Sequence, residues 1–276
     1  MELSVTCHPM PIRRPVVGSG FARIAATGDL HVSAFGRPVR LDPLPDLRGQ
    51  ADLLVVAGDI TDSGLLTELD AAVEYLSDAR IPIVAVLGNH DLRTRRRVAF
   101  RRILTRGGIQ LLDGESLVVT GDNGFRLGVV GTSGCGGGFW PEAGPERFPG
   151  RAMKALAIRS KRETERLESC LAGLRSDGRL VLTHFSPTPT TLGREPLAKY
   201  WMLGNSELGR VIDRHGVDLA IHGHAHLGNE IGATHGGVPV RNVALPVTNA
   251  IRVFRVGPDG MVDPAPDAVT VAEAAR

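Results

Sequence analysis

The sequence predicts an α/β fold in which two mixed β-sheets are covered by helices. Of its 276 residues, 42% are apolar, which is enough for a real core in one large domain or two small ones. Strand-like and helix-like segments alternate, a strand-rich stretch follows, and the alternation then returns. Short polar clusters directly follow several of the apolar runs, and ligands in such folds bind beyond the carboxyl ends of strands.

The strands are predicted from short apolar runs bounded by polar residues, Gly or Pro. Residues 53–57 form a wholly apolar run, which is typical of a strand buried on both faces. The stretch Asp122-Asn123-Gly124 predicts a hairpin turn. The expected strands cover residues 21–27, 53–57, 81–87, 110–112, 116–120, 126–131, 180–183, 219–221, 238–245 and 250–256.

The helices are predicted at about 63–76, 94–106, 151–175 and 207–214. In the first of them, apolar residues recur at helical spacing from Leu65 and Leu69 to Leu76. Residues 1–20 hold three prolines and little periodicity, so we expect a loose extension there, one domain over 21–256 and a mobile tail over 257–276.

Charge and cysteine content exclude several classes of protein. The net charge of +2 gives no bulk electrostatic argument for binding nucleic acid or a membrane. Cys7, Cys135 and Cys170 are far apart and form no CxxC pair, which argues against a disulfide framework and a thiolate zinc site. No signal-peptide pattern or membrane-length apolar run is present, so we expect a cytoplasmic protein.

The polar clusters carry the functional prediction. They are Asp29-Leu30-His31, Gly58-Asp59, Gly88-Asn89-His90-Asp91, His184 and His222-Gly223-His224-Ala225-His226. His, Asp and Asn offer nitrogen and oxygen donors that suit divalent metals. Clustering so many of these side chains at one edge of a sheet destabilises the fold unless cations bind there, because buried polar groups must be paired. The sequence therefore predicts a two-metal hydrolytic centre at one edge of a sheet.

The order of these clusters closely resembles the calcineurin-like metallophosphoesterases over residues 27–226. The resemblance implies a four-layer αββα sandwich. It also implies that Asp29, His31 and His226 hold a first metal, that Asn89, His184 and His224 hold a second, and that Asp59 bridges the two. His90 resembles the catalytic histidine of the family, which donates a proton to the leaving group or stabilises its charge, and Asp91 would orient His90.

Two divalent ions about 3.5–4 Å apart lower the pKa of a shared water and clamp the phosphate oxygens. We therefore expect a metal-bridging hydroxide as nucleophile, with no covalent enzyme intermediate. Sites with such donors accept manganese, iron, zinc, cobalt or magnesium according to supply, so the sequence leaves the metal open.

Other residues near the motifs have simpler interpretations. His222 is expected to be a core histidine and Asp62 a helix N-cap. The arginines over 93–102 either present cations to a phosphate-bearing substrate or form the solvated face of a helix, and the second is favoured. The Gly-rich stretch 133–139 could wrap a phosphate, but a flexible loop is favoured. In the long loop 185–205, Tyr200 and Trp201 could stack on a base or equally anchor the loop to the core.

The expected function is hydrolysis of a small-molecule phosphoester, with a preference for phosphodiesters of nucleotide type. That preference rests on a resemblance to the bacterial cyclic-nucleotide phosphodiesterase branch. A phosphomonoesterase acting on small molecules or phosphoproteins is the alternative. A further alternative is a non-catalytic metal-binding scaffold. The last is a nuclease, which is suggested only by the arginine run and would show a nucleic-acid affinity that falls steeply with salt.

Overall fold

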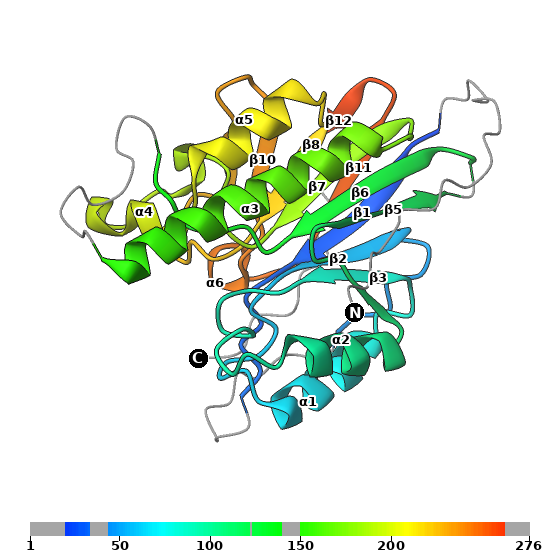
Figure 1. Ribbon diagram of the computed structural model, residues 1–276. Coiled ribbons are helices and arrows are strands. Elements are labelled where there is room, and N and C mark those ends of the chain that lie inside the picture. The colour runs from blue at the N-terminus through cyan, green and yellow to red at the C-terminus, as the bar shows by residue number, and fades with distance from the viewer. Residues whose placement is uncertain (1–19, 34–43, 122, 140–149, 263–276) are drawn as a thin grey trace, which may run out of the picture.

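The computed structural model describes residues 20–33, 44–121, 123–139 and 150–262, which form two six-stranded sheets (Figure 1). The first sheet contains β1 (Ala22–Thr27), β2 (Leu53–Ala57), β3 (Ile83–Val86), β4 (Ile109–Leu111), β11 (Arg252–Gly257) and β12 (Gly260–Val262). The second contains β5 (Glu115–Thr120), β6 (Arg126–Thr132), β7 (Gly178–Thr183), β8 (Leu219–His222), β9 (Ile231–Ala233) and β10 (Pro239–Asn242).

Both sheets are mixed, as the sequence predicted. In the first, strands β1 to β4 are parallel, and β11 joins β1 antiparallel. In the second, β6, β7, β8 and β10 are parallel, while β5 and β9 are antiparallel edge strands. The carboxyl ends of the central parallel strands in each sheet therefore lie together at one edge.

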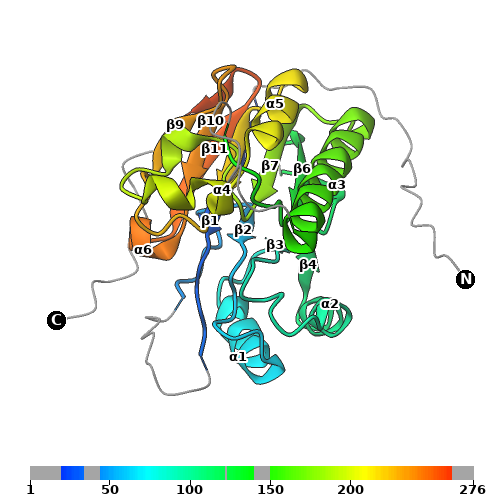
Figure 2. The ribbon, with the colours of Figure 1, turned by 60° about the vertical axis from the view of Figure 1, so that its left-hand side comes forward.

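Helices cover the outer face of each sheet, which gives the four layers αββα (Figure 2). Helices α1 (Leu66–Ser77) and α2 (Arg97–Arg106) pack on the first sheet, and α3 (Arg151–Gly173) and α5 (Ser206–Arg214) pack on the second. The short segments are η1 (Pro189–Thr191), η2 (Leu197–Lys199), α4 (Tyr200–Leu203) and α6 (Leu245–Thr248). Within the described part of the chain, no helix is both long and apolar enough to cross a bilayer.

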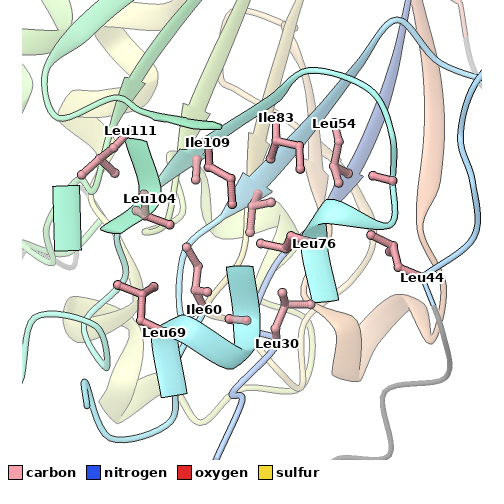
Figure 3. Close-up of a cluster of buried hydrophobic side chains, with 14 of the residues drawn as sticks. Leu30, Leu44, Leu54, Ile60, Leu69, Leu76, Ile83, Leu104, Ile109 and Leu111 are labelled. Atoms are coloured by element: carbon pink, nitrogen blue, oxygen red, sulfur yellow. The ribbon is translucent and has the colours of Figure 1, made fainter. Parts of the chain in front are cut away.

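Strand β2 shows how the layers are held together. Leu54 and Val56 face the core beneath α1 and α2, part of which is drawn in Figure 3. Leu53 and Val55 face the opposite way, into the core between the two sheets. Because successive side chains of a strand point to opposite faces, an apolar strand with every residue buried must lie between two cores. The prediction for this strand is confirmed.

The sequence prediction differs from the structure at several element boundaries. The strand expected over 238–245 ends at Asn242, and α6 follows with a proline in its first turn. Strand β12 lies within the expected tail, where it pairs with β11. Helix α1 begins at Leu66 with Leu65 as its N-cap, so the N-cap prediction for Asp62 is wrong. Residues 1–19 and 263–276 lie outside the described residues.

Candidate metal centre

The structure brings the predicted ligands together at the carboxyl ends of five strands. Loops after β1, β2 and β3 supply residues from the first sheet, and loops after β7 and β8 supply residues from the second. Among the described residues, three groups of potential ligand atoms form, each with its atoms within 4.8 Å of one another. These groups are Asp29 with His31 and His226, His31 with Asp59 and His90, and Asp59 with His184 and His224.

The backbone of these loops is tightly constrained. Asp29, His31, Asp59 and His224 all have positive φ angles, of 55°, 46°, 46° and 72°. Such angles are uncommon for residues other than glycine, and they cluster at functional sites where the surrounding structure enforces them. The amides of Asp29 and His31 donate to the carbonyls of Gly58 and Asp59, at 2.9 and 3.0 Å, so the loops after β1 and β2 hold each other in place.

Asp29 is buried and ionised at the centre of the first group. Burial by itself would raise its pKa, but hydrogen bonding to His226 and the charges of His184 and His226 lower the pKa to about 2. Its carboxylate lies 2.9 Å from Nε2 of His226, and it accepts the backbone N–H of His224 at 2.9 Å. The hydrogen bond to Asp29 raises the pKa of His226, although burial opposes this rise. The pair therefore couples β1 to the loop after β8.

His31 has two buried ring nitrogens with no hydrogen-bond partner among the described residues. Its Nε2 lies 3.9 Å from Asp29 and 3.8 Å from Asp59, which is too far for a hydrogen bond to either carboxylate. Burial lowers the pKa of this ring, which favours the neutral form with a free lone pair. Its Nδ1 also lies 3.4 Å from the carboxylate of Asp62. A buried imidazole among carboxylates that makes no hydrogen bond fits a metal ligand, because a cation would satisfy all of these groups.

His184 provides a second test of whether the site suits a cation. Its Nδ1 lies 2.8 Å from the carbonyl of Ala57, which can only accept, so Nδ1 carries a proton and, in the neutral ring that binds a metal, Nε2 carries the lone pair. That Nε2 faces Oδ1 of Asn89 at 2.9 Å and Oδ2 of Asp59 at 3.5 Å. In the neutral ring these three atoms are all acceptors, so their convergence calls for a positive charge among them, which a bound cation would supply.

His224 completes the second group. Burial, together with the nearby His184, lowers the pKa of His224 to about 3, so the ring is neutral. Its Nε2 lies 3.3 Å from the carbonyl of Met202 in α4, which leaves the lone pair on Nδ1. The geometry thus supplies imidazoles, an amide oxygen and two carboxylates, and this donor set fits borderline divalent metals.

His90 lies beside this donor set. Its Nδ1 is 2.6 Å from the carbonyl oxygen of Asp62, and its Nε2 is 3.9 Å from the Asp59 carboxylate. Nη2 of Arg93 lies 2.9 Å from the same Nε2, while Nη1 of Arg93 donates to the Asp62 carbonyl at 3.1 Å. Since a guanidinium can only donate and a carbonyl can only accept, His90 carries its proton on Nδ1 and accepts at Nε2.

Asp91 was predicted to orient His90, but its contacts in the structure are with other groups. Its buried carboxylate accepts hydrogen bonds from the backbone N–H groups of Ile60, Thr61 and Gly88 and from the Thr61 hydroxyl. Burial and the negative charge of Asp59 raise its pKa to about 6. These contacts tie the loop after β2 to the loop after β3. The recorded contacts that orient the His90 ring come instead from Asp62 and Arg93, which the sequence prediction missed.

His222 is a fully buried histidine behind the metal-binding loops. Its Nε2 lies 2.7 Å from the hydroxyl of Thr191, and its Nδ1 lies 2.7 Å from the carbonyl of Gly223. Burial lowers its pKa to about 4. The ring thus fastens segment η1 to strand β8, in agreement with the core role predicted from the sequence.

The Gly-rich stretch and the long loop pack against each other. The amides of Gly137 and Gly138 donate to the carbonyls of Trp201 and Gly204, so they are not available to wrap a phosphate. Tyr200 meets Phe139 edge to face at 6.3 Å, beside a small buried cluster. Of the two interpretations left open for Tyr200, the structure favours an anchor to the core.

Comparison with known proteins agrees with this geometry. The family described as calcineurin-like phosphoesterase matches residues 22–228, and the chain belongs to that family. It is therefore a metallophosphoesterase, a hydrolase with candidate metal-binding histidines and aspartates. No curated protein sequence matches the chain at a significant level.

Several solved structures share the fold. A phosphopantetheinyl hydrolase from Mycobacterium tuberculosis superposes with a TM-score of 0.60 at 17% identity, covering 91% of this chain and 98% of that one. A sulfate thiohydrolase, SoxB, from Thermus thermophilus gives 0.52 at 14% identity, covering 92% of this chain and 57% of that one. These likenesses confirm the two-sheet αββα architecture.

Proposed function

We propose that this chain hydrolyses phosphodiesters of nucleotide type at a dinuclear centre. The observation that carries the proposal is the convergence of acceptor atoms from His184, Asn89 and Asp59 at the point where the two sheets meet. Asp29, His31 and His226 would hold the first ion, Asn89, His184 and His224 the second, and Asp59 would lie between them. When bound, the ions would activate a water and stabilise the charge on the phosphoryl oxygens.

The residues of the chain supply the rest of the reaction. Asp29 and Asp59 are the only carboxylates in the proposed ligand set, so two divalent ions would leave the centre with a net positive charge that attracts a phosphate. His90 is fixed at Nδ1 by the carbonyl of Asp62, so its Nε2 is the atom that faces the substrate. When that atom is protonated as well, His90 would pass this proton to the leaving oxygen or stabilise the charge that develops there.

The test compares hydrolysis of bis(p-nitrophenyl) phosphate and p-nitrophenyl phosphate with added manganese. We expect faster turnover of the diester, and a loss of at least 100-fold in both Asn89→Ala and His90→Ala, a magnitude typical of removing a metal ligand or a general acid. Asn123→Ala and His215→Ala are matched controls, because they remove an exposed amide and a partly exposed imidazole far from the centre.

Faster turnover of the monoester would contradict the diester preference and favour a phosphomonoesterase. Bound metal without turnover in any divalent ion would favour the scaffold alternative. The substrate panel should also contain a phosphopantetheinyl ester, because the Mycobacterium tuberculosis protein of similar fold is named for hydrolysing that group.

A further inference from the structure

We propose that Arg93 is a substrate-binding residue of this centre, and that its guanidinium binds a non-bridging oxygen of the phosphoryl group that is hydrolysed. The inference rests on the proposed phosphoesterase function and deepens it. The sequence favoured a solvated helix face for the whole arginine run, and the structure separates Arg93 from the rest of that run.

The position of Arg93 relative to the proposed ligands is the first argument. Its Nη2 is 2.9 Å from Nε2 of His90, and that same Nε2 is 3.9 Å from the carboxylate of Asp59. Only one imidazole ring therefore separates the guanidinium from the carboxylate that would lie between the two ions. The side chain is exposed to solvent, so a substrate can reach it without displacing core residues.

The charge of Arg93 is the second argument. Farther along the run, Arg97 is ion-paired with Asp113 at 2.6 Å, and Arg101 with Glu115 at 3.1 Å. For Arg93, the structure records no carboxylate partner within the described residues, and its two contacts are with a carbonyl oxygen and an imidazole nitrogen. Its positive charge is thus left for an anion that arrives from solvent.

Hydrogen-bond chemistry is the third argument. The donation from Nη1 to the Asp62 carbonyl anchors one side of the guanidinium, and Nη2 lies against His90 beside the centre. A charged phosphoryl oxygen is a stronger acceptor than a neutral imidazole nitrogen, and the planar fork of a guanidinium matches a phosphate. A bound phosphoryl group would therefore draw Nη2 away from His90, which leaves Nε2 of His90 free to face the leaving oxygen.

The experiment measures binding of inorganic phosphate to the manganese-loaded protein by isothermal titration calorimetry, alongside kcat and KM for the diester. We expect Arg93→Gln to weaken phosphate binding and to raise KM by about 10- to 100-fold, the range for losing a charge-assisted hydrogen bond. Arg93→Lys should fall between Arg93→Gln and the wild type, because it keeps the charge but loses the fork. Manganese affinity should stay within about twofold.

Two comparisons separate direct binding from weaker effects. Arg96→Gln removes an exposed cation from the same run, and phosphate affinity should change by less than about twofold if the effect is local. In a His90→Ala background, Arg93→Gln should still weaken phosphate binding, because direct contact does not depend on the imidazole.

Several outcomes would overturn the proposal. They are unchanged phosphate affinity in Arg93→Gln, an equal loss in Arg96→Gln, disappearance of the effect in the His90→Ala background, or a loaded wild-type protein that binds no phosphate. Phosphate binding that depends on Arg93 in a protein without turnover would instead contradict the proposed hydrolysis while supporting the role of Arg93.

Discussion

His184 and Asn89 face each other across the join between the two sheets, with Nε2 of His184 2.9 Å from Oδ1 of Asn89. His184 follows β7 of the second sheet, and Asn89 follows β3 of the first. Because Nδ1 of His184 donates to the carbonyl of Ala57, both atoms are acceptors when the ring is neutral. A cation between them would therefore link the two sheets, so metal binding and fold stability should be coupled.

The first prediction is that divalent metal stabilises the folded chain. At a free metal concentration one hundred times Kd, linkage adds about 2.7 kcal/mol to the free energy of unfolding. Urea unfolding with manganese and with a chelator measures the difference. The gain should shrink in Asn89→Ala and persist in Asn123→Ala. Equal stability with metal and with chelator in the wild-type protein would contradict the coupling.

The second prediction concerns Gly223, which lies between two histidines of the last motif. A Cβ at this position would collide with the carboxylate of Asp29. We expect Gly223→Ala to displace Asp29 and to weaken metal binding by at least about tenfold, a loss typical of disturbing the groups that hold a metal ligand. Gly173→Ala is the matched control, because a Cβ there meets no atom within 4 Å. Calorimetric titration with manganese tests both variants, and similar affinities in the two would rule out the collision.

The third prediction concerns Asp91. Asp91→Ala would leave buried backbone N–H groups of Ile60, Thr61 and Gly88 without an acceptor, at a cost of about 3 kcal/mol or more. Asp91→Asn keeps an acceptor oxygen and should cost less. Urea unfolding in the presence of a chelator isolates this effect from metal binding. Asp70→Ala, at an exposed position of α1, should change stability by less than about 0.5 kcal/mol. A similar small change in Asp91→Ala would show that the carboxylate does not hold the two loops together.

The fourth prediction is a pH dependence of stability caused by His222. Burial lowers its pKa in the folded protein from 6.5 to about 4, so between these values the unfolded chain binds more protons than the folded one. The contribution of His222 to the free energy of unfolding is therefore fully present above pH 6.5. It falls by at most about 3 kcal/mol as the pH drops from 6.5 to 4, and it levels off below pH 4. Unfolding at several pH values in chelator should show a weaker dependence for His222→Gln. The variant His215→Gln, at a partly exposed position, should keep the full dependence. Identical profiles for His222→Gln and the wild type would contradict the assignment.

Local sequence predicted the structure correctly where a pattern of residues has a single physical explanation. The apolar run of β2 indicated a strand between two cores, because no exposed position could tolerate it. The polar clusters after strands indicated a shared edge, because parallel strands end at the same side of a sheet. The boundaries at α6 and β12 were missed because both elements are too short to show a period in the sequence: β12 is a three-residue strand in a hairpin with β11, and α6 is a four-residue helix.

The roles of Asp62, Asp91 and Arg93 depended on contacts that sequence spacing does not specify. Asp62 resembles an N-cap in the sequence, but in the structure its carbonyl oxygen lies 2.6 Å from Nδ1 of His90. Asp91 directly follows His90, yet its carboxylate turns back to the amides of two other loops. Arg93 looks like one member of a run of arginines until its neighbours in space are known.

The sequence by itself determined the class of fold, the order of the motifs and the identity of the candidate ligands, because hydrophobic periodicity and donor chemistry are properties of the chain alone. The tertiary structure decided which donors face one another and which protons they carry. Those properties follow from the partner that each side chain meets when two sheets, distant in sequence, close on the same edge.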